Sequence, residues 1–108
     1  MSEEAKIDHD NMALVRLLVR YGDQVQSIVF CLPKKLEVGG EERYPVRELW
    51  GQLEPGGGAT PDVDALLPLD GFGEPLSVSR WVNGKRAYRY VPFRVRFDCR
   101  HLLQAEVH

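Results

Sequence analysis

The sequence predicts an α+β fold, in which an antiparallel sheet of about five to six strands carries one main helix near residues 44–53. Three observations support this prediction. Two long apolar runs flank Gly22-Asp23, residues 44–53 repeat apolar side chains at helical spacing, and residues 93–99 alternate between apolar and charged side chains. The expected order, β-β-(β)-α-loop-β-β-β, fits a curled sheet or a small open barrel.

The composition is typical of one soluble domain. Of 108 residues, 44% are hydrophobic and 28% are charged, so the chain can bury one core without a disulfide or a metal ion. We expect residues 1–10 to form a flexible leader and residues 11–108 to form a single α+β domain with a flexible loop near 54–75. The sequence has no pattern of a membrane span or a signal peptide, so a cytoplasmic location is expected.

The segment MALVRLLVRYGDQVQSIVFCL fits either a helix or a hairpin. Four side chains recur at helical spacing: Leu14, Leu17, Leu18 and Tyr21. The hairpin explains more, because a type II′ turn at Gly22-Asp23 sets four cross-strand pairs, of which three are wholly apolar. These pairs are Val19–Gln26, Leu17–Ile28, Val15–Phe30 and Ala13–Leu32. We therefore predict strands on both sides of the turn, followed by a short edge strand at 36–38.

The helix candidate covers residues 44–53. Pro45 suits the first helical turn, where its missing N–H loses no hydrogen bond. One apolar stripe is expected, made of Val46, Leu49, Trp50 and Leu53. Trp50 is predicted to be buried against the sheet. A helical turn or two, capped by Thr60, is expected over 60–67.

Residues 76–97 are expected to form a hairpin that runs into a further strand. Asn83-Gly84 favours a type I′ turn, because both of its residues tolerate positive φ. Pro92 predicts a bulge or a crossing to a second sheet, since proline cannot donate to a strand ladder. One buried face should follow, formed by Phe93, Val95, Phe97 and Cys99. Residues 101–107 are expected to add a last short strand.

Signals of catalysis and of bound cofactors are weak. Cys31 and Cys99 lie in apolar runs, so buried reduced thiols are expected. A disulfide between them is the alternative if their strands pair. Cys99 with His101 is the one candidate nucleophile pair, and it lacks a third orienting group. Asp62 and Asp64 lie in a Pro- and Gly-rich segment, where solvated charge is the expected state. We predict no enzyme, no metal site and no cofactor.

Basic and aromatic side chains gather in the 76–97 hairpin. The predicted binding residues are Arg80, Trp81, Lys85, Arg86, Tyr88, Arg89, Tyr90, Arg94 and Arg96. Exposed residues of these types on a sheet bind single-stranded nucleic acid by stacking on bases and neutralising phosphates. The other interpretation is that the aromatic side chains form core or rim packing and the basic ones form solvated faces. The need for a core in a small chain favours this second interpretation.

The leading functional hypothesis is a small non-enzymatic protein-interaction module: an adaptor, inhibitor or accessory subunit that acts by surface binding. It rests on the missing catalytic patterns and on a charge asymmetry, since residues 1–75 carry a net charge of −7 and residues 76–108 one of +5. The alternative is binding of RNA or single-stranded DNA by the 76–97 hairpin. A basic face free of carboxylates would favour nucleic acid, and a mixed face a protein partner. A homo-oligomer formed through an edge strand is a further option, and no membrane contact is expected.

Overall fold

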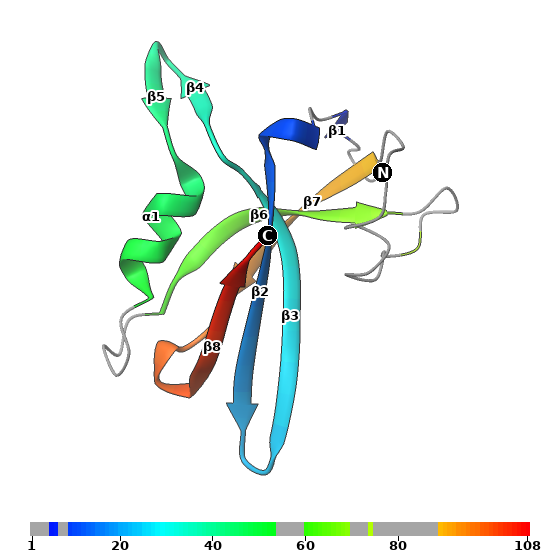
Figure 1. Cartoon of the computed structure of the whole chain (residues 1–108), viewed down its shortest axis with the longest axis vertical. Helices are drawn as coiled ribbons and strands as arrows, with labels where there is room; N and C mark the ends of the chain where they lie inside the picture. Colours follow the sequence, from blue (N-terminus) through cyan, green and yellow to red (C-terminus); the bar gives the residue numbers. More distant parts are fainter. Residues whose placement is uncertain (1–4, 7–8, 54–59, 70–73, 75–88) are drawn as a thin grey trace.

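The computed structural model describes residues 5–6, 9–53, 60–69, 74 and 89–108. In this part of the chain, six antiparallel strands form one sheet in the order β1-β7-β6-β3-β2-β8, and β4 and β5 form a small second sheet (Figure 1). The elements are β1 (Ala5–Lys6), η1 (His9–Asn11), β2 (Met12–Tyr21), β3 (Gln24–Pro33), β4 (Leu36–Val38), β5 (Glu41–Arg43), α1 (Pro45–Gln52), β6 (Asp62–Leu69), β7 (Arg89–Arg96), η2 (Cys99–His101) and β8 (Leu102–Val107). The predicted α+β fold with an antiparallel sheet and one main helix is confirmed.

Strands β2 and β3 form the predicted hairpin. Gly22 has a φ of 62°, and Asp23 has no positive φ, as a type II′ turn requires. The observed register contains all four predicted pairs, including Val15 opposite Phe30 and Leu17 opposite Ile28. The helical interpretation of residues 12–21 is therefore wrong.

The sheet is open and its two halves run in different directions. β3 and β6 meet at a single ladder pair, Cys31 opposite Leu66. Figure 1 shows β6 and β7 running across the direction of β2 and β3. Helix α1 packs beside β3.

Most of the buried hydrophobic side chains in the described part of the chain form two clusters. The larger one contains Val15, Leu17, Val19, Phe30, Leu32, Leu49, Ala65, Val95, Phe97 and Cys99. The smaller one contains Met12, Leu14, Cys31 and Tyr90. Because successive strand residues point to opposite faces, Leu14 and Val15 place these clusters on opposite sides of the sheet. Cys31 and Cys99 thus lie on different faces, and both are free thiols.

Strand β6 corrects the prediction of a short helix at 60–67 and, over the same residues, that of a flexible loop near 54–75. Residues 54–59, 70–73 and 75 of that predicted loop lie outside the described residues. It pairs with β7 along its whole length, from Asp62 opposite Arg96 to Leu69 opposite Arg89. Ala65 in its centre is buried in the larger cluster. The segment forms a strand because β7 supplies hydrogen-bond partners for its backbone. A short isolated helical turn in this segment would lack such a partner.

Pro92 does not interrupt β7, which is a second correction. The register with β6 continues through Pro92, which lies opposite Leu66. A proline fits a strand where its nitrogen faces away from a paired neighbour. On the far side of β7, the described part of β1 reaches only Arg89 and Tyr90, so no ladder bond is required there.

Helix α1 covers Pro45–Gln52, one residue shorter at each end than the predicted 44–53, and the burial of one predicted side chain differs. Leu49 is 1% exposed and packs into the larger cluster, with Val46 and Leu53 half-buried beside it. Trp50 is 46% exposed, so the prediction of a buried Trp50 is wrong. A helix turns about 100° per residue, and this turn carries Trp50 from the centre of the apolar stripe to its margin.

The remaining predictions have mixed outcomes. The short strand at 36–38 is confirmed as β4, and the last strand is confirmed as β8, which follows η2. Ala5–Lys6 of the expected leader pairs with β7, so part of that segment belongs to the sheet. The Asn83-Gly84 turn lies outside the described residues. No helix in the described ranges is long and apolar enough to cross a membrane.

Candidate functional site

Three of the nine predicted binding residues can be placed with their side chains: Tyr90, Arg94 and Arg96, all on β7. Arg89 also belongs to β7. The other five, Arg80, Trp81, Lys85, Arg86 and Tyr88, lie outside the described residues. Tyr90 is fully buried in the smaller cluster, so it belongs to the core and not to a binding surface. The prediction that Tyr90 is a binding residue is therefore wrong.

Arg94 and Arg96 are exposed, but carboxylates of β6 hold both of them. Arg96 Nη2 lies 2.7 Å from Asp62 Oδ2, and Arg94 Nη2 lies 3.0 Å from Asp64 Oδ1. Arg94 Nε also lies 3.4 Å from Asp62 Oδ1. The strand register creates these contacts, since Asp62 is opposite Arg96 and Asp64 is opposite Arg94. This surface is therefore mixed in charge and not purely basic.

The ion pairs shift ionisation in the expected directions. The hydrogen bond from Arg96 is the main cause that lowers the pKa of Asp62, and the charge of Arg94 adds to it. The charges of Asp62 and then Asp64 raise the pKa of Arg94. Both arginines already contact carboxylates, so they approach a phosphate only by giving up part of an existing contact.

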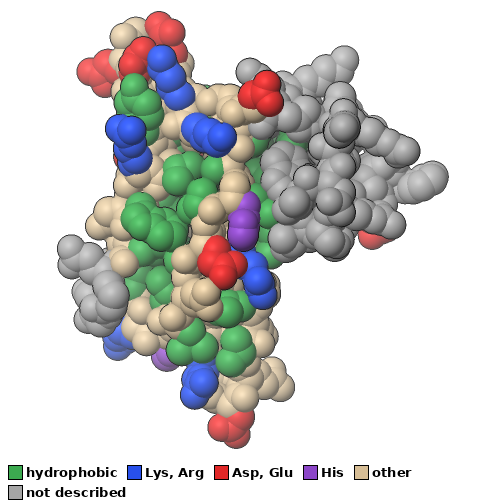
Figure 2. Space-filling model, in the orientation of Figure 1, with side chains coloured by type: hydrophobic (Ala, Val, Ile, Leu, Met, Phe, Trp, Pro, Cys, Tyr) green, Lys and Arg blue, Asp and Glu red, His purple; other side chains and the backbone are tan. Residues whose placement is uncertain are grey.

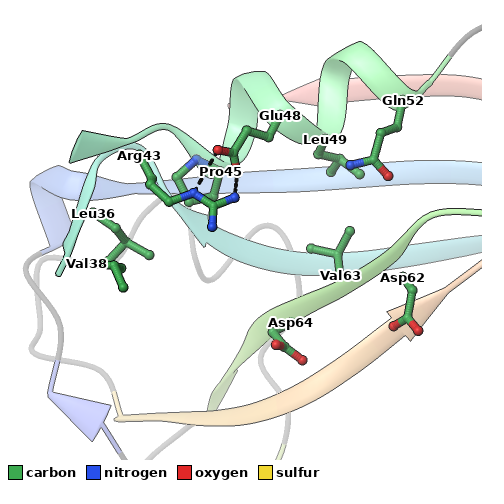
Figure 3. A pocket seen from close by; sticks show the side chains of 10 residues that line it. All are labelled: Leu36, Val38, Arg43, Pro45, Glu48, Leu49, Gln52, Asp62, Val63 and Asp64. Carbon is green, nitrogen blue, oxygen red and sulfur yellow. Dashed lines mark hydrogen bonds and ion pairs between the residues drawn. The ribbon is translucent and has the colours of Figure 1, made fainter. Parts of the chain in front are cut away.

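A groove of about 260 Å³ opens where β4, β5, α1 and β6 come together (Figure 3). Its apolar lining consists of Leu36, Val38, Pro45, Leu49 and Val63, and its polar lining of Arg43, Glu48, Gln52, Asp62 and Asp64. Figure 3 shows Arg43 and Glu48 joined on the helix side, with the two aspartates on the β6 side. None of these ten residues belongs to the predicted binding set, because the groove unites segments that are far apart in the sequence.

The β4–β5 hairpin that borders this groove projects beyond the main sheet (Figure 1). Gly39 and Gly40 form its turn with φ values of 60° and 84°, as a type I′ turn requires. Its strands are exposed, and Val38 is 56% accessible to solvent. Figure 2 shows charges of both signs on this hairpin and hydrophobic side chains gathered next to it.

Hydrogen bonds fix both ends of the projecting hairpin. At its start, Asn11 Nδ2 donates to the carbonyl of Lys35 at 2.9 Å, and the N–H of Lys35 donates to Asn11 Oδ1 at 3.1 Å. At its end, Arg43 donates to both carboxylate oxygens of Glu48, at 2.9 and 2.7 Å. Such a two-fold arginine–carboxylate contact restricts orientation strongly. The groove is thus bordered by a hairpin that is held in place before anything binds.

A second ionic contact lies across the hairpin. Lys35 Nζ lies 2.9 Å from Glu42 Oε1, and the Tyr44 hydroxyl donates to Glu42 Oε2 at 2.9 Å. Hydrogen bonds from Lys35 and then Tyr44 lower the pKa of Glu42. Glu42 also lies directly opposite Glu37, and the Lys35 ammonium offsets the repulsion between these carboxylates.

The candidate Cys99–His101 pair is not arranged as a nucleophile and a base. The Cys99 side chain is buried, and its thiol donates to the carbonyl of Gln52 at 3.5 Å. Burial, and then the charge of Asp98, raise the pKa of Cys99, which favours the unreactive thiol. His101 Nε2 instead faces Asp98 Oδ2 at 4.0 Å. Within the described ranges, no three His, Cys, Asp or Glu side chains are grouped as metal ligands.

Comparison of the chain with protein-family models, with curated proteins and with solved structures finds no match. The role of the protein is therefore inferred from its own surface.

Proposed function

We propose that this protein is a small non-enzymatic interaction module, an adaptor, inhibitor or accessory subunit, that binds a protein partner in the groove beside the β4–β5 hairpin. One observation carries the proposal: apolar and charged side chains together line the groove. Leu36, Val38 and Val63 supply apolar contact, and the Arg43–Glu48 pair lies beside them. Protein interfaces likewise combine apolar contact with charged and polar groups.

The rigidity of the groove supports the same proposal. Asn11 fixes the first strand of the hairpin and Glu48 fixes its second strand, so little chain order has to be gained on binding. Preorganised surfaces bind more tightly because that entropic cost is smaller. The partner that fits is a segment with one or two apolar side chains for Leu36 and Val38. A basic or N–H donor group beside them would suit Asp64, whose side chain is largely exposed.

The nucleic-acid hypothesis remains the alternative proposal, and the described surface favours it less. Tyr90 is buried, and carboxylates neutralise Arg94 and Arg96. A long polyanion near these arginines would also meet Asp62 and Asp64. A mixed face of this kind suits a protein partner, whose own charges can be arranged to match both signs.

The test is a pull-down from a native extract with three forms of the tagged chain. Val38→Glu places a charge in the groove, and Val25→Glu places the same charge on an equally exposed valine near the distant β2–β3 turn. We expect one stoichiometric protein partner with the wild type and with Val25→Glu, and its loss with Val38→Glu. Equal retention by all three forms, or no partner together with turnover of a metabolite by the purified protein, would contradict the proposal.

A further inference from the structure

Among the described residues, strand β8 is the last strand of the main sheet, with one row of backbone groups unpaired. It pairs with β2 on one side, and no strand within the described residues pairs with its other side. His108 exchanges both backbone hydrogen bonds with Leu14, at 2.8 and 3.2 Å. Hydrogen-bonded and non-hydrogen-bonded positions alternate in an antiparallel ladder. Val107 and Ala105 therefore turn their N–H and C=O groups outward, away from β2.

The side chains of β8 protect this edge only in part, since Glu106 is the one charged residue of the strand. Natural edge strands commonly carry lysine or proline, which discourage pairing with another strand. The sequence of β8, LLQAEV, has neither. Leu103 is 51% exposed and Val107 is 41% exposed. The register irregularity with β2 lies at the start of the strand, so residues 104–107 remain regular.

We infer that β8 pairs in antiparallel fashion with β8 of a second copy of this chain, across a two-fold axis at Ala105. The new ladder forms only where residues whose N–H and C=O groups point away from β2 lie opposite each other in the two copies. This requirement restricts the two-fold axis to a few registers. With the axis at Ala105, Leu103 of each copy lies opposite Val107 of the other. Gln104 of each copy then lies opposite Glu106 of the other, where an amide N–H can donate to a carboxylate.

The register with its axis at Ala105 is more favourable than the registers with the axis one residue away on either side. An axis at Glu106 would place two carboxylates directly opposite each other, which is unfavourable. An axis at Gln104 would place Val107 opposite residue 101, outside the strand. The register at Ala105 pairs both exposed apolar side chains. Within one chain, Gln104 Nε2 already donates to Glu106 Oε1 at 2.8 Å, so the same donor and acceptor need only exchange partners.

The surface of β8 is separate from the groove of the proposed function, so the two proposals can fail independently. The probe is the whole protein, studied by sedimentation equilibrium over a series of concentrations. Gln104→Glu adds a carboxylate opposite Glu106 at two symmetric positions, and Gln104→Lys adds the opposite charge at the same positions. Gln26→Glu, at an exposed position of β3, is the matched control.

We expect a wild-type dimer of twice the 12.3 kDa chain mass. Gln104→Glu should raise its dissociation constant roughly two- to thirtyfold, Gln104→Lys should lower it, and Gln26→Glu should leave it unchanged. A wild type that stays monomeric at every concentration overturns the inference. Weakening by both Gln104 variants overturns the Ala105 register, because it would place Gln104 on the axis. A dimer insensitive to all three changes, or a wild type that pairs only with a strand of another protein, also overturns it.

Discussion

Asp62 on β6 lies directly opposite Arg96 on β7, and the Arg96 guanidinium contacts its carboxylate at 2.7 Å. The same strand pair aligns Asp64 with Arg94 two residues further on. The sequences Asp-Val-Asp and Arg-Val-Arg thus form a ladder of opposite charges on one exposed face. This ladder changes how the basic C-terminal third of the chain should be understood, because part of its positive charge is matched within the sheet.

Leu49 and Trp50 are neighbours in α1 with opposite expected effects on stability. Leu49→Ala removes a buried side chain and should lower the free energy of unfolding by about 2–5 kcal/mol. Trp50→Ala removes a side chain that is nearly half exposed, and should cost clearly less although Trp is larger. Urea unfolding of both variants measures the difference. A larger cost for Trp50→Ala would contradict the position of the helix on the sheet.

Two glycines offer a second matched pair. Gly22 has positive φ, so Gly22→Ala should cost about 1–2 kcal/mol through backbone strain, although an added Cβ meets nothing within 4 Å. Gly51 lies in α1 without positive φ, and an added Cβ there meets nothing within 4 Å, so Gly51→Ala should stabilise by about 0.4–1 kcal/mol. Thermal unfolding should show opposite shifts of the melting temperature. Shifts of the same sign would contradict the turn geometry or the helix assignment.

Elements whose evidence is local could be predicted from the sequence. The β2–β3 hairpin has the turn pair Gly22-Asp23 with one apolar strand on each side of it. Turn geometry and the pattern of apolar residues together specify one register. The edge strand at 36–38 and α1 likewise lie next to local glycine and proline signals, whereas the pairing of β4 with β5 was not predicted. Cys99 was correctly placed on a buried face by the alternation of residues 93–99.

Elements that depend on a distant partner were missed. β6 begins after Pro61, contains Pro68, and pairs with a strand about thirty residues away. Its proline content favours a loop unless β7 is already known to be its neighbour. One signal was available: two acidic residues spaced by one valine match two basic residues spaced by one valine. The groove depends on the same long-range contact, since Val63 reaches it only when β6 is a strand.

Acid should reveal the contribution of Asp98. Hydrogen bonds from the Arg100 side chain and backbone lower the pKa of Asp98 from 3.8 to about 2. A carboxyl with a lowered pKa in the folded state stabilises the fold above its unfolded pKa, and the stabilisation disappears as pH falls through the folded value. Asp98→Asn should therefore destabilise at pH 7, and its difference from wild type should shrink between about pH 4 and pH 2. If the difference between the urea midpoints of wild type and Asp98→Asn stays constant from about pH 4 to pH 2, the Asp98–Arg100 contact is contradicted.

The charge ladder itself can be tested with nucleic acid as a probe. Asp62→Asn with Asp64→Asn should free Arg94 and Arg96, and should strengthen retention of a labelled random 20-mer of single-stranded DNA at low salt. Its affinity should also fall more steeply with salt, by up to about 0.7 in slope for each arginine that gains a phosphate. The matched control, Glu37→Gln with Glu41→Gln, changes the net charge equally on the β4–β5 hairpin and leaves the ladder itself unchanged. If the wild type binds the DNA as strongly as the Asp62 and Asp64 variant, the carboxylates do not mask the arginines. That result would support the nucleic-acid hypothesis. If the control gains as much retention, the effect comes from net charge and not from the ladder.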